Sequence, residues 1–192
     1  KMTRYSLLAR EGDPMVWDFG SAAVHHRLYA PWLKPENCRA GLNGLRGAIP
    51  PDNNLFKRSA SEIATLLRAQ GVADMPLGLD IVEPPMLFAL QEEGMPVMDG
   101  QQIMLDAREI KGIDGITLLN QAAAMVDGVY HMIGEELKPG TRENDIVAKA
   151  NKMLYEMGSD DVEAINAISG ERCSPHPHNF TDRMVRPGDQ AF

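Results

Sequence analysis

The sequence contains few cysteines, few aromatic residues and no long apolar run. Of its 192 residues, two are cysteine, Cys38 and Cys173, and 6% are aromatic. Two distant cysteines without a Cys-x-x-Cys spacing argue against a disulfide network and favour reduced thiols. No stretch approaches the ~20 apolar residues of a membrane helix, and no basic segment followed by an apolar one opens the chain as in a signal peptide. We therefore expect a cytoplasmic protein without a membrane partner.

Clustered basic residues are absent as well. The chain has 19 Lys and Arg against 27 Asp and Glu, which gives a formal net charge of −8. A protein that binds duplex nucleic acid needs a basic surface that displaces counterions from the phosphates. This sequence offers no such cluster, so we predict no nucleic-acid partner and attribute the acidity to solubility.

Short apolar segments alternate with helical ones in the first hundred residues. The composition, 44% hydrophobic and 24% charged, is that of an ordinary globular protein. The alternation of strand and helix predicts an α/β layer with parallel pairing. The expected elements are a β-hairpin over 4–10 and 15–19, a loop over 34–54, a helix from Ser59 or Ser61 to Gln70, a strand over 77–82, a helix from Pro84 to Glu93 and a strand over 95–99.

Helices dominate after residue 100, where we place the boundary between two domains, 1–100 and 101–192. Apolar residues recur at three- and four-residue steps from Asp114 to Leu137, which predicts a long helix whose apolar stripe is buried in the core. The other expected elements are a short helix over 101–107, a helix capped by Thr141 that runs to Met157, a strand over 162–168, a loop over 169–183 and a turn over 186–189 before a last strand.

Two histidines flank a proline in the loop predicted over 169–183. An imidazole can donate a hydrogen bond, accept one or bind a metal near neutral pH, and loops on a strand scaffold favour function over packing. His176 and His178 are therefore the candidate catalytic residues. Two other interpretations stay open. In the first, both histidines are ordinary exposed loop residues. In the second, His-x-His is a metal-binding pair, although no neighbouring carboxylate or cysteine spacing completes a set of four ligands.

Five short motifs occur in order along the second half of the chain. They are Glu109-Ile110-Lys111, Pro139-Gly140-Thr141-Arg142-Glu143, Ser169-Gly170, Pro177-His178 and Arg186-Pro187-Gly188-Asp189. In this order they resemble the creatinase, aminopeptidase P and prolidase superfamily, the pita-bread metallopeptidases. The first hundred residues are similar, in the layout of their elements, to the later part of the N-terminal domain of these enzymes. One position departs from the family pattern: Gly115 stands where an acidic residue usually follows the Lys.

The resemblance implies a fold class of α/β followed by α+β. A partial creatinase-like N-terminal α/β domain would occupy 1–100, and the first part of a pita-bread catalytic domain would occupy 101–192. The family holds two divalent metal ions (Mn, Zn, Co or Fe) with two Asp, one His and two Glu. All five ligands would lie beyond Phe192, and an enzyme of the creatinase type would be metal-free. The metal site is therefore expected outside this chain.

The resemblance also assigns a role to the loop histidine, which in the family helps with the substrate and its developing charge. Counted from the Gly-Asp turn, His176 is one residue early and His178 is one residue late. His178 keeps the Pro-His pair of prolidase-like members and is preferred.

The activity implied by the resemblance is the hydrolysis of a C–N bond, for which this chain would be an incomplete fragment of the enzyme. The substrate would be a Xaa-Pro peptide or a small amidine or lactam metabolite, so we expect a small-molecule or short-peptide partner and a homodimer. Two alternatives remain. One is a catalytically inactive pita-bread domain that is used for binding. The other is a lyase that acts on dimethylsulfoniopropionate, as some relatives do.

Overall fold

The computed structural model describes residues 4–20, 22–175 and 177–192. The chain forms two compact units, Lys1–Ile110 (unit 1) and Lys111–Phe192 (unit 2). The boundary predicted from the sequence lies near residue 100, whereas the two units divide after Ile110. The short helix that follows residue 100 therefore belongs to unit 1. Each unit has its own helices and its own packed side chains.

Unit 1 begins with a three-stranded sheet in the order β1–β2–β3. The first two strands pair antiparallel with Tyr5 opposite Trp17, which confirms the predicted hairpin. β3 pairs parallel to β2 inside the segment 34–54, so the expectation of a loop there is wrong at this strand. Three residues are too few for an alternating pattern to stand out among the Pro, Gly and Asn around them. The elements are β1 (Tyr5–Leu7), β2 (Met15–Asp18), α1 (Ala22–Tyr29) and β3 (Cys38–Ala40), with short 3-10 turns at Pro35–Asn37 and Pro51–Asn53.

A second, two-stranded sheet in unit 1 follows the predicted strand–helix–strand order. Its strands run parallel with Leu77 opposite Val97, and a helix connects them, which confirms the α/β pattern. Pro84 and Pro85 open that helix, since a first turn needs no N–H from them. The elements are α2 (Leu55–Ala69), β4 (Leu77–Leu79), α3 (Pro84–Glu92), β5 (Val97–Asp99) and α4 (Gln101–Glu109).

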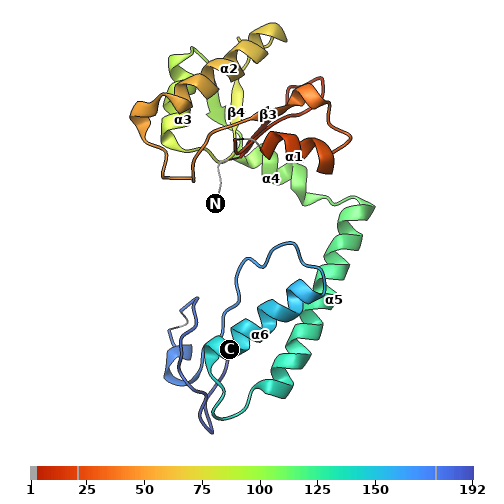
Figure 1. The fold of residues 1–192 in the computed structure, drawn as a ribbon, viewed down its shortest axis with the longest axis vertical. Helices are drawn as coiled ribbons and strands as arrows, with labels where there is room; N and C mark the ends of the chain where they lie inside the picture. The colour runs from red at the N-terminus through yellow and green to blue at the C-terminus, as the bar shows by residue number, and fades with distance from the viewer. Residues whose placement is uncertain (1–3, 21, 176) are drawn as a thin grey trace. The chain divides into compact units, whose positions relative to one another are not determined.

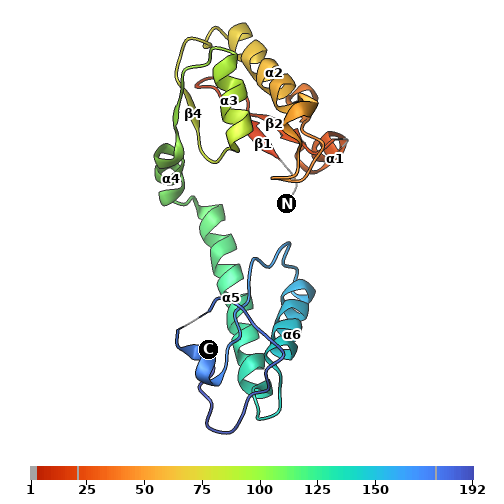
Figure 2. The same cartoon turned by 90° about the vertical axis from the view of Figure 1, so that its left-hand side faces the viewer.

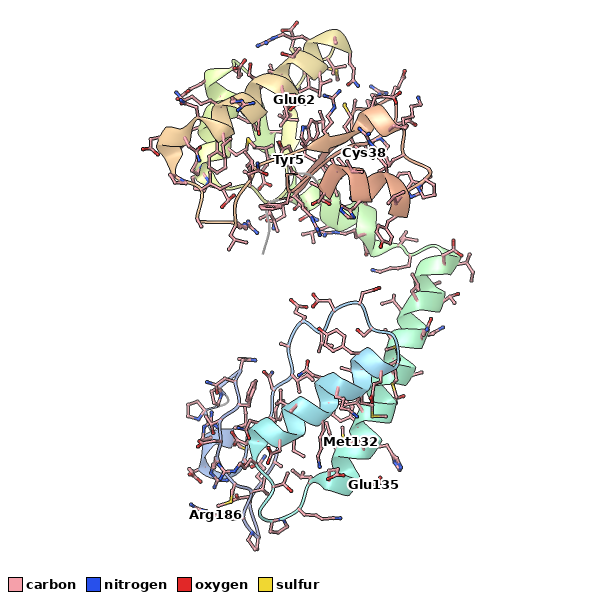
Figure 3. All side chains as sticks on the ribbon, viewed as in Figure 1. Tyr5, Cys38, Glu62, Met132, Glu135 and Arg186 are labelled. Carbon is pink, nitrogen blue, oxygen red and sulfur yellow. The ribbon has the colours of Figure 1, made fainter. Side chains whose placement is uncertain are left out.

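The core of unit 1 forms where α2 and α3 lie side by side against the strands (Figures 1 and 2). Trp17 is fully buried and stacks on Tyr5, whose position is labelled in Figure 3. Burial of large apolar side chains of α2 contributes about 1.5–3 kcal/mol each. The buried residues of α2 are Phe56, Ser59, Ala60, Ile63, Ala64 and Leu67.

The start of α2 differs from the prediction. Neither Ser59 nor Ser61 caps this helix, because it begins at Leu55 and both serines lie inside it. The N–H of Leu55 donates to Asn53 Oδ1 at 3.0 Å, and Asn54 takes the left-handed conformation with φ of 59°. The Asn pair thus starts the helix one turn before the first serine.

Asp18 ties the first sheet to α1. Its carboxylate is 4% exposed and accepts hydrogen bonds from Arg4 Nε at 2.6 Å and Phe19 N at 2.7 Å, with His26 Nδ1 at 3.2 Å. Burial by itself would raise the pKa of Asp18, but the bonds from Arg4, Phe19 and His26 outweigh it and lower the pKa below its ordinary value. The carboxylate therefore stays charged at neutral pH and holds α1 at the end of β2.

Unit 2 is built on two packed helices, α5 (Ile113–Glu136) and α6 (Glu143–Glu156), which folds back beside α5 (Figure 1). The predicted long helix is confirmed, but the predicted burial of its apolar stripe is wrong. Val129 is the only buried residue of α5, while Leu119 is 56% exposed and Tyr130 is 69% exposed. The periodic apolar residues are enough to predict a helix, but their burial requires another element that packs on them. Within unit 2, α6 packs against one side of α5 and leaves much of the apolar stripe exposed.

The strand predicted over 162–168 is not formed. Among the described residues the only pairing at this place is a bridge between Ser169 and Ala191, flanked by two bonds between Ile168 and Phe192 at 2.9 Å each. An extended segment becomes a strand only when a neighbour runs beside it, and residues 162–167 have none here. Within the described part of the chain, no helix has the length and apolarity needed to cross a bilayer.

Candidate functional site

His178 lies exposed on the loop that follows the 3-10 turn Gly170–Cys173. Its Nδ1 is 3.5 Å from Nδ2 of Asn166, in the segment that precedes the loop. If the amide donates, Nδ1 accepts and the ring proton resides on Nε2. His176, the other predicted catalytic residue, lies outside the described residues.

The loop is attached to the start of α6 through the helix backbone. Glu143 N donates to Arg183 O at 3.1 Å and Asn144 N donates to Thr181 O at 3.0 Å. These bonds satisfy N–H groups that a helix leaves free in its first turn. The predicted cap by Thr141 is wrong, because its hydroxyl instead donates to Glu136 O at 3.1 Å.

The carboxylate of Glu143 holds both ends of the loop. It is 2% exposed and accepts from the N–H and the hydroxyl of Ser169, both at 2.8 Å, and from the N–H and hydroxyl of Thr181 at 2.8 and 2.9 Å. Burial by itself would raise the pKa of Glu143, but the bonds from Ser169 and Thr181 outweigh it and lower the pKa. The residues 169 and 181 are thus fixed to one charged group.

Arg183 joins the loop to the predicted Gly-Asp turn. Its guanidinium donates to Asp189 at 2.6 Å, to Glu171 at 2.7 Å and to Ser169 Oγ at 2.8 Å. These bonds lower the pKa of Asp189 and of Glu171 and raise the pKa of Arg183. Three acceptors leave the guanidinium little freedom, although Glu171 itself is exposed.

The turn over 186–189 forms as predicted. Asp189 N donates to Arg186 O at 3.1 Å, and the Asp189 carboxylate accepts from Arg186 N at 2.8 Å. Gly188 provides the left-handed conformation with φ of 85° that such a turn needs. The turn lies at one end of unit 2, where Figure 3 labels Arg186.

An open, mostly apolar groove of about 1100 Å³ runs along α5 inside unit 2. Its walls include one side of α5 with Val126 and Tyr130, the extended segment that precedes Ser169, and Phe192. Asn166, the contact of His178, is one of the polar groups on its wall. The loop histidine therefore lies near a surface that is accessible and largely apolar.

The family resemblance raises the question of a metal. Across residues 4–20, 22–175 and 177–192, no three His, Cys, Asp or Glu side chains converge as a metal-binding group.

Sequence reasoning missed Glu143, Arg172 and Arg183 as parts of the site. Glu143 carries a signal, because it ends the motif Pro139–Glu143, but an acidic residue at a helix start is also favoured by the helix dipole alone. An acidic residue placed just inside a helix, followed by a loop with two arginines, is a pattern that can indicate such an anchor. The spacing in sequence does not show which arginine reaches which carboxylate.

Comparison with known proteins identifies the second half of the chain. Residues 117–192 match the sequence model of metallopeptidase family M24. The resemblance to the pita-bread superfamily is confirmed. The M24 segment begins inside α5 and contains α6, Glu143, the loop with His178 and the Gly-Asp turn.

Curated relatives match either nearly the whole chain or about half of it. Dimethylsulfoniopropionate lyase DddP of Roseovarius nubinhibens is 28% identical over 192 residues, which covers 95% of this chain and 42% of that protein. The probable dipeptidase PepE of Mycobacterium tuberculosis is 28% identical over 95 residues, which covers 50% of this chain and 25% of that protein. The chain thus spans less than half the length of these relatives.

Solved structures support the fold class. The Xaa-Pro dipeptidase from Bacillus anthracis superposes with a TM-score of 0.69 at 17% identity, over 100% of this chain and 49% of that chain. At this identity the likeness shows the fold, and it confirms the predicted α/β layer followed by part of a pita-bread fold. The assignment of 1–100 and 101–192 to two family domains stays a prediction.

Proposed function

We propose that this chain supplies the substrate loop of an M24-type enzyme that hydrolyses the C–N bond of a Xaa-Pro peptide. The observation that carries the proposal is the placement of His178. It sits exposed on a loop that Glu143 fixes at residues 169 and 181, within the segment that matches family M24. A side chain held on an anchored loop can meet a substrate in a reproducible position.

The proposed role of His178 is to stabilise negative charge on the substrate. In this proposal Asn166 donates to Nδ1, and the other ring nitrogen, Nε2, donates its proton to the substrate. Such a donor strengthens its bond to a carbonyl oxygen as the carbon is attacked and the oxygen gains charge. The divalent metal ions of the proposed enzyme would be held by ligands that the resemblance places outside this chain. The proposed role of His178 does not require a metal ligand among the described residues.

A second activity is favoured by a specific observation. The match to dimethylsulfoniopropionate lyase covers 95% of this chain, whereas the match to the probable dipeptidase covers 50%. We therefore keep a lyase acting on dimethylsulfoniopropionate as the second candidate.

We also propose that the full-length protein is a homodimer. Size-exclusion chromatography with light scattering measures the mass of the purified protein and tests this directly.

The deciding experiment uses the full-length gene product supplied with Mn²⁺, Zn²⁺, Co²⁺ or Fe²⁺. A panel of Xaa-Pro dipeptides, Xaa-Ala dipeptides and dimethylsulfoniopropionate is followed by proton NMR. We expect cleavage of the Xaa-Pro members. Consumption of dimethylsulfoniopropionate instead would transfer the proposal to the lyase, and no turnover of any compound would favour an inactive binding domain.

The role of the histidine is tested on the substrate that turns over. His178→Ala should lower kcat by about 10²-fold, as expected for the loss of one charge-stabilising or proton-transferring group. His131→Ala is the matched control, because His131 is exposed on α5 and pairs with Glu135. His176→Ala in the same assay decides between the two loop histidines, and an unchanged kcat in His178→Ala would remove the assignment.

A further inference from the structure

Glu143 brings a charge into the interior of unit 2. It is the first residue of α6, and its side chain is almost completely buried. A buried carboxylate costs free energy unless it is paired or accepts several hydrogen bonds, so its partners indicate what it does. The reaction proposed above gives Glu143 no contact with substrate.

The two oxygens of this carboxylate serve opposite ends of the loop. Oε1 accepts both bonds from Ser169, and Oε2 accepts both bonds from Thr181. Oε2 also accepts from Arg172 Nη1, which lies inside the loop. One carboxylate thus closes the loop and orients a guanidinium within it.

Arg172 extends this arrangement toward His178. Besides Glu143, its Nη1 donates to Thr181 Oγ1 at 2.9 Å, and its Nη2 donates to Asn179 Oδ1 at 2.7 Å. A guanidinium is planar and places its donors in a fixed fork, so a guanidinium fixed by Glu143 also fixes where the acceptor of Nη2 can lie. That acceptor belongs to the residue directly after His178.

We propose that Glu143 and Arg172 form a positioning pair that sets the place of His178 by way of Asn179. The pair holds the side chain of Asn179, the residue directly after the histidine, and Asn166 contacts the ring of His178 itself. The benefit to catalysis rests on the proposed function of His178. The geometry itself is a property of this chain and can be measured without turnover.

A lysine at position 172 separates the charge of the arginine from its shape. Arg172→Lys keeps a cation beside Glu143, but one ammonium cannot bond Glu143, Thr181 and Asn179 in the planar arrangement of the fork. Glu143→Gln keeps one carbonyl oxygen and directs an NH₂ group at the donors on the other end. Asn179→Ala removes only the last contact and changes an exposed side chain, so it keeps the fold.

The test measures the contact between Asn166 and His178 by NMR on the 192-residue chain, with labelled Asn side chains and His rings. The wild type should show a cross-peak between the Asn166 amide protons and the His178 ring. It should be lost in Arg172→Lys, Glu143→Gln and Asn179→Ala. It should persist in the matched controls Arg142→Lys and Asp145→Asn, which carry the same chemical changes at exposed positions of the first turn of α6 and its cap.

Two outcomes separate the positioning pair from the proposed function. A cross-peak that survives in Arg172→Lys and in Asn179→Ala overturns the pair, whatever the turnover of the full-length enzyme. If Glu143→Gln unfolds unit 2, these two variants decide alone. A cross-peak lost in both, combined with unchanged turnover in His178→Ala, refutes the function and leaves the pair standing. If both proposals hold, Arg172→Lys lowers kcat by up to about 10²-fold with little change in KM, as misplacement of a reacting group does.

Discussion

Gly170 occupies a position that only glycine fits, and its replacement by alanine tests the loop network directly. Its φ is +62°, in the left-handed region that a side chain disfavours. A Cβ at this residue would also lie 2.8 Å from both Arg183 Cζ and Asp189 Oδ1. Gly188 has a similar conformation, with φ of +85°, but a Cβ there would meet no atom within 4 Å. Gly188→Ala is therefore a control that shares the backbone strain and lacks the collision.

The two contributions have different sizes. A left-handed alanine costs about 1 kcal/mol in either variant. In Gly170→Ala the guanidinium of Arg183 must also leave Asp189 and Ser169, although its side chain is only 11% exposed. Loss of a charged hydrogen-bond network of this kind costs about 2 kcal/mol. We expect about 3 kcal/mol for Gly170→Ala and about 1 kcal/mol for Gly188→Ala.

Hydrogen exchange measured by mass spectrometry reports this free energy for the loop itself. Under conditions where exchange follows the opening equilibrium, 3 kcal/mol corresponds to roughly 10²-fold faster exchange, and 1 kcal/mol to roughly fivefold. Peptides that contain Ser169, Gly170 and Thr181 carry the signal. Peptides from unit 1 provide an internal reference that should not change.

Equal exchange rates in Gly170→Ala and Gly188→Ala would refute the reasoning. They would mean that Arg183 moves aside at no cost and that its contacts with Ser169 and Asp189 do not hold the loop. A large effect on unit 1 peptides would also contradict it, because both glycines lie in unit 2.

Two further predictions concern the buried carboxylates. Asp18→Ala should destabilise unit 1 by about 2–3 kcal/mol, because the N–H of Phe19 and the side chains of Arg4 and His26 lose a buried acceptor. Urea unfolding followed by the fluorescence of Trp17 and Trp32 measures this loss. The control Asp13→Ala breaks only an exposed pair with Lys34 and should cost less than about 1 kcal/mol. The lowered pKa of Glu143 means that its contribution to unit 2 is complete above the unfolded-state pKa of about 4.3 and is lost as the pH falls through the lower folded-state pKa. Exchange protection at Ser169 and Thr181 should therefore decrease in acid. Glu143→Gln removes the titrating group, so the decrease should be smaller in this variant. The same pH profile in the variant and in the wild type would contradict the prediction.

Elements with strong local signals could be predicted from the sequence. Pro84 and Pro85 mark the start of α3 and Gly94 follows its end, while the apolar steps of α5 define a helix without reference to anything else. The hairpin at the start of the chain is equally local, because a turn joins its two strands.

Features that depend on distant partners could not be predicted in the same way. β3 exists because β2 offers it an edge, and residues 162–167 are not a strand because none of the described residues pairs with them. The burial of α5 depends on what covers it, which its own periodicity does not contain.

The same division applies to the site. His178 could be proposed because histidines beside proline in a polar loop are unusual and chemically capable, and its role stays a prediction. The importance of Glu143 could not be, because its partners Ser169 and Thr181 lie 26 and 38 positions away in the chain. A helix start explains an acidic residue well enough by itself, so the motif alone does not reveal the contacts of Glu143 with the loop.

The attachment of residues 169 and 181 to a single side chain of α6 has a consequence for how the loop between them can vary. Closure of the loop is secured mainly from outside it, so the residues between Arg172 and Asn179 can be exchanged or lengthened without loosening the ends. Doubling the length of a flexible loop costs only about 0.6 kcal/mol in closure entropy. A transplant of residues 173–178 between M24 relatives that keep Glu143, Ser169, Arg172 and Thr181 is therefore a practical route to new loop surfaces on an unchanged scaffold.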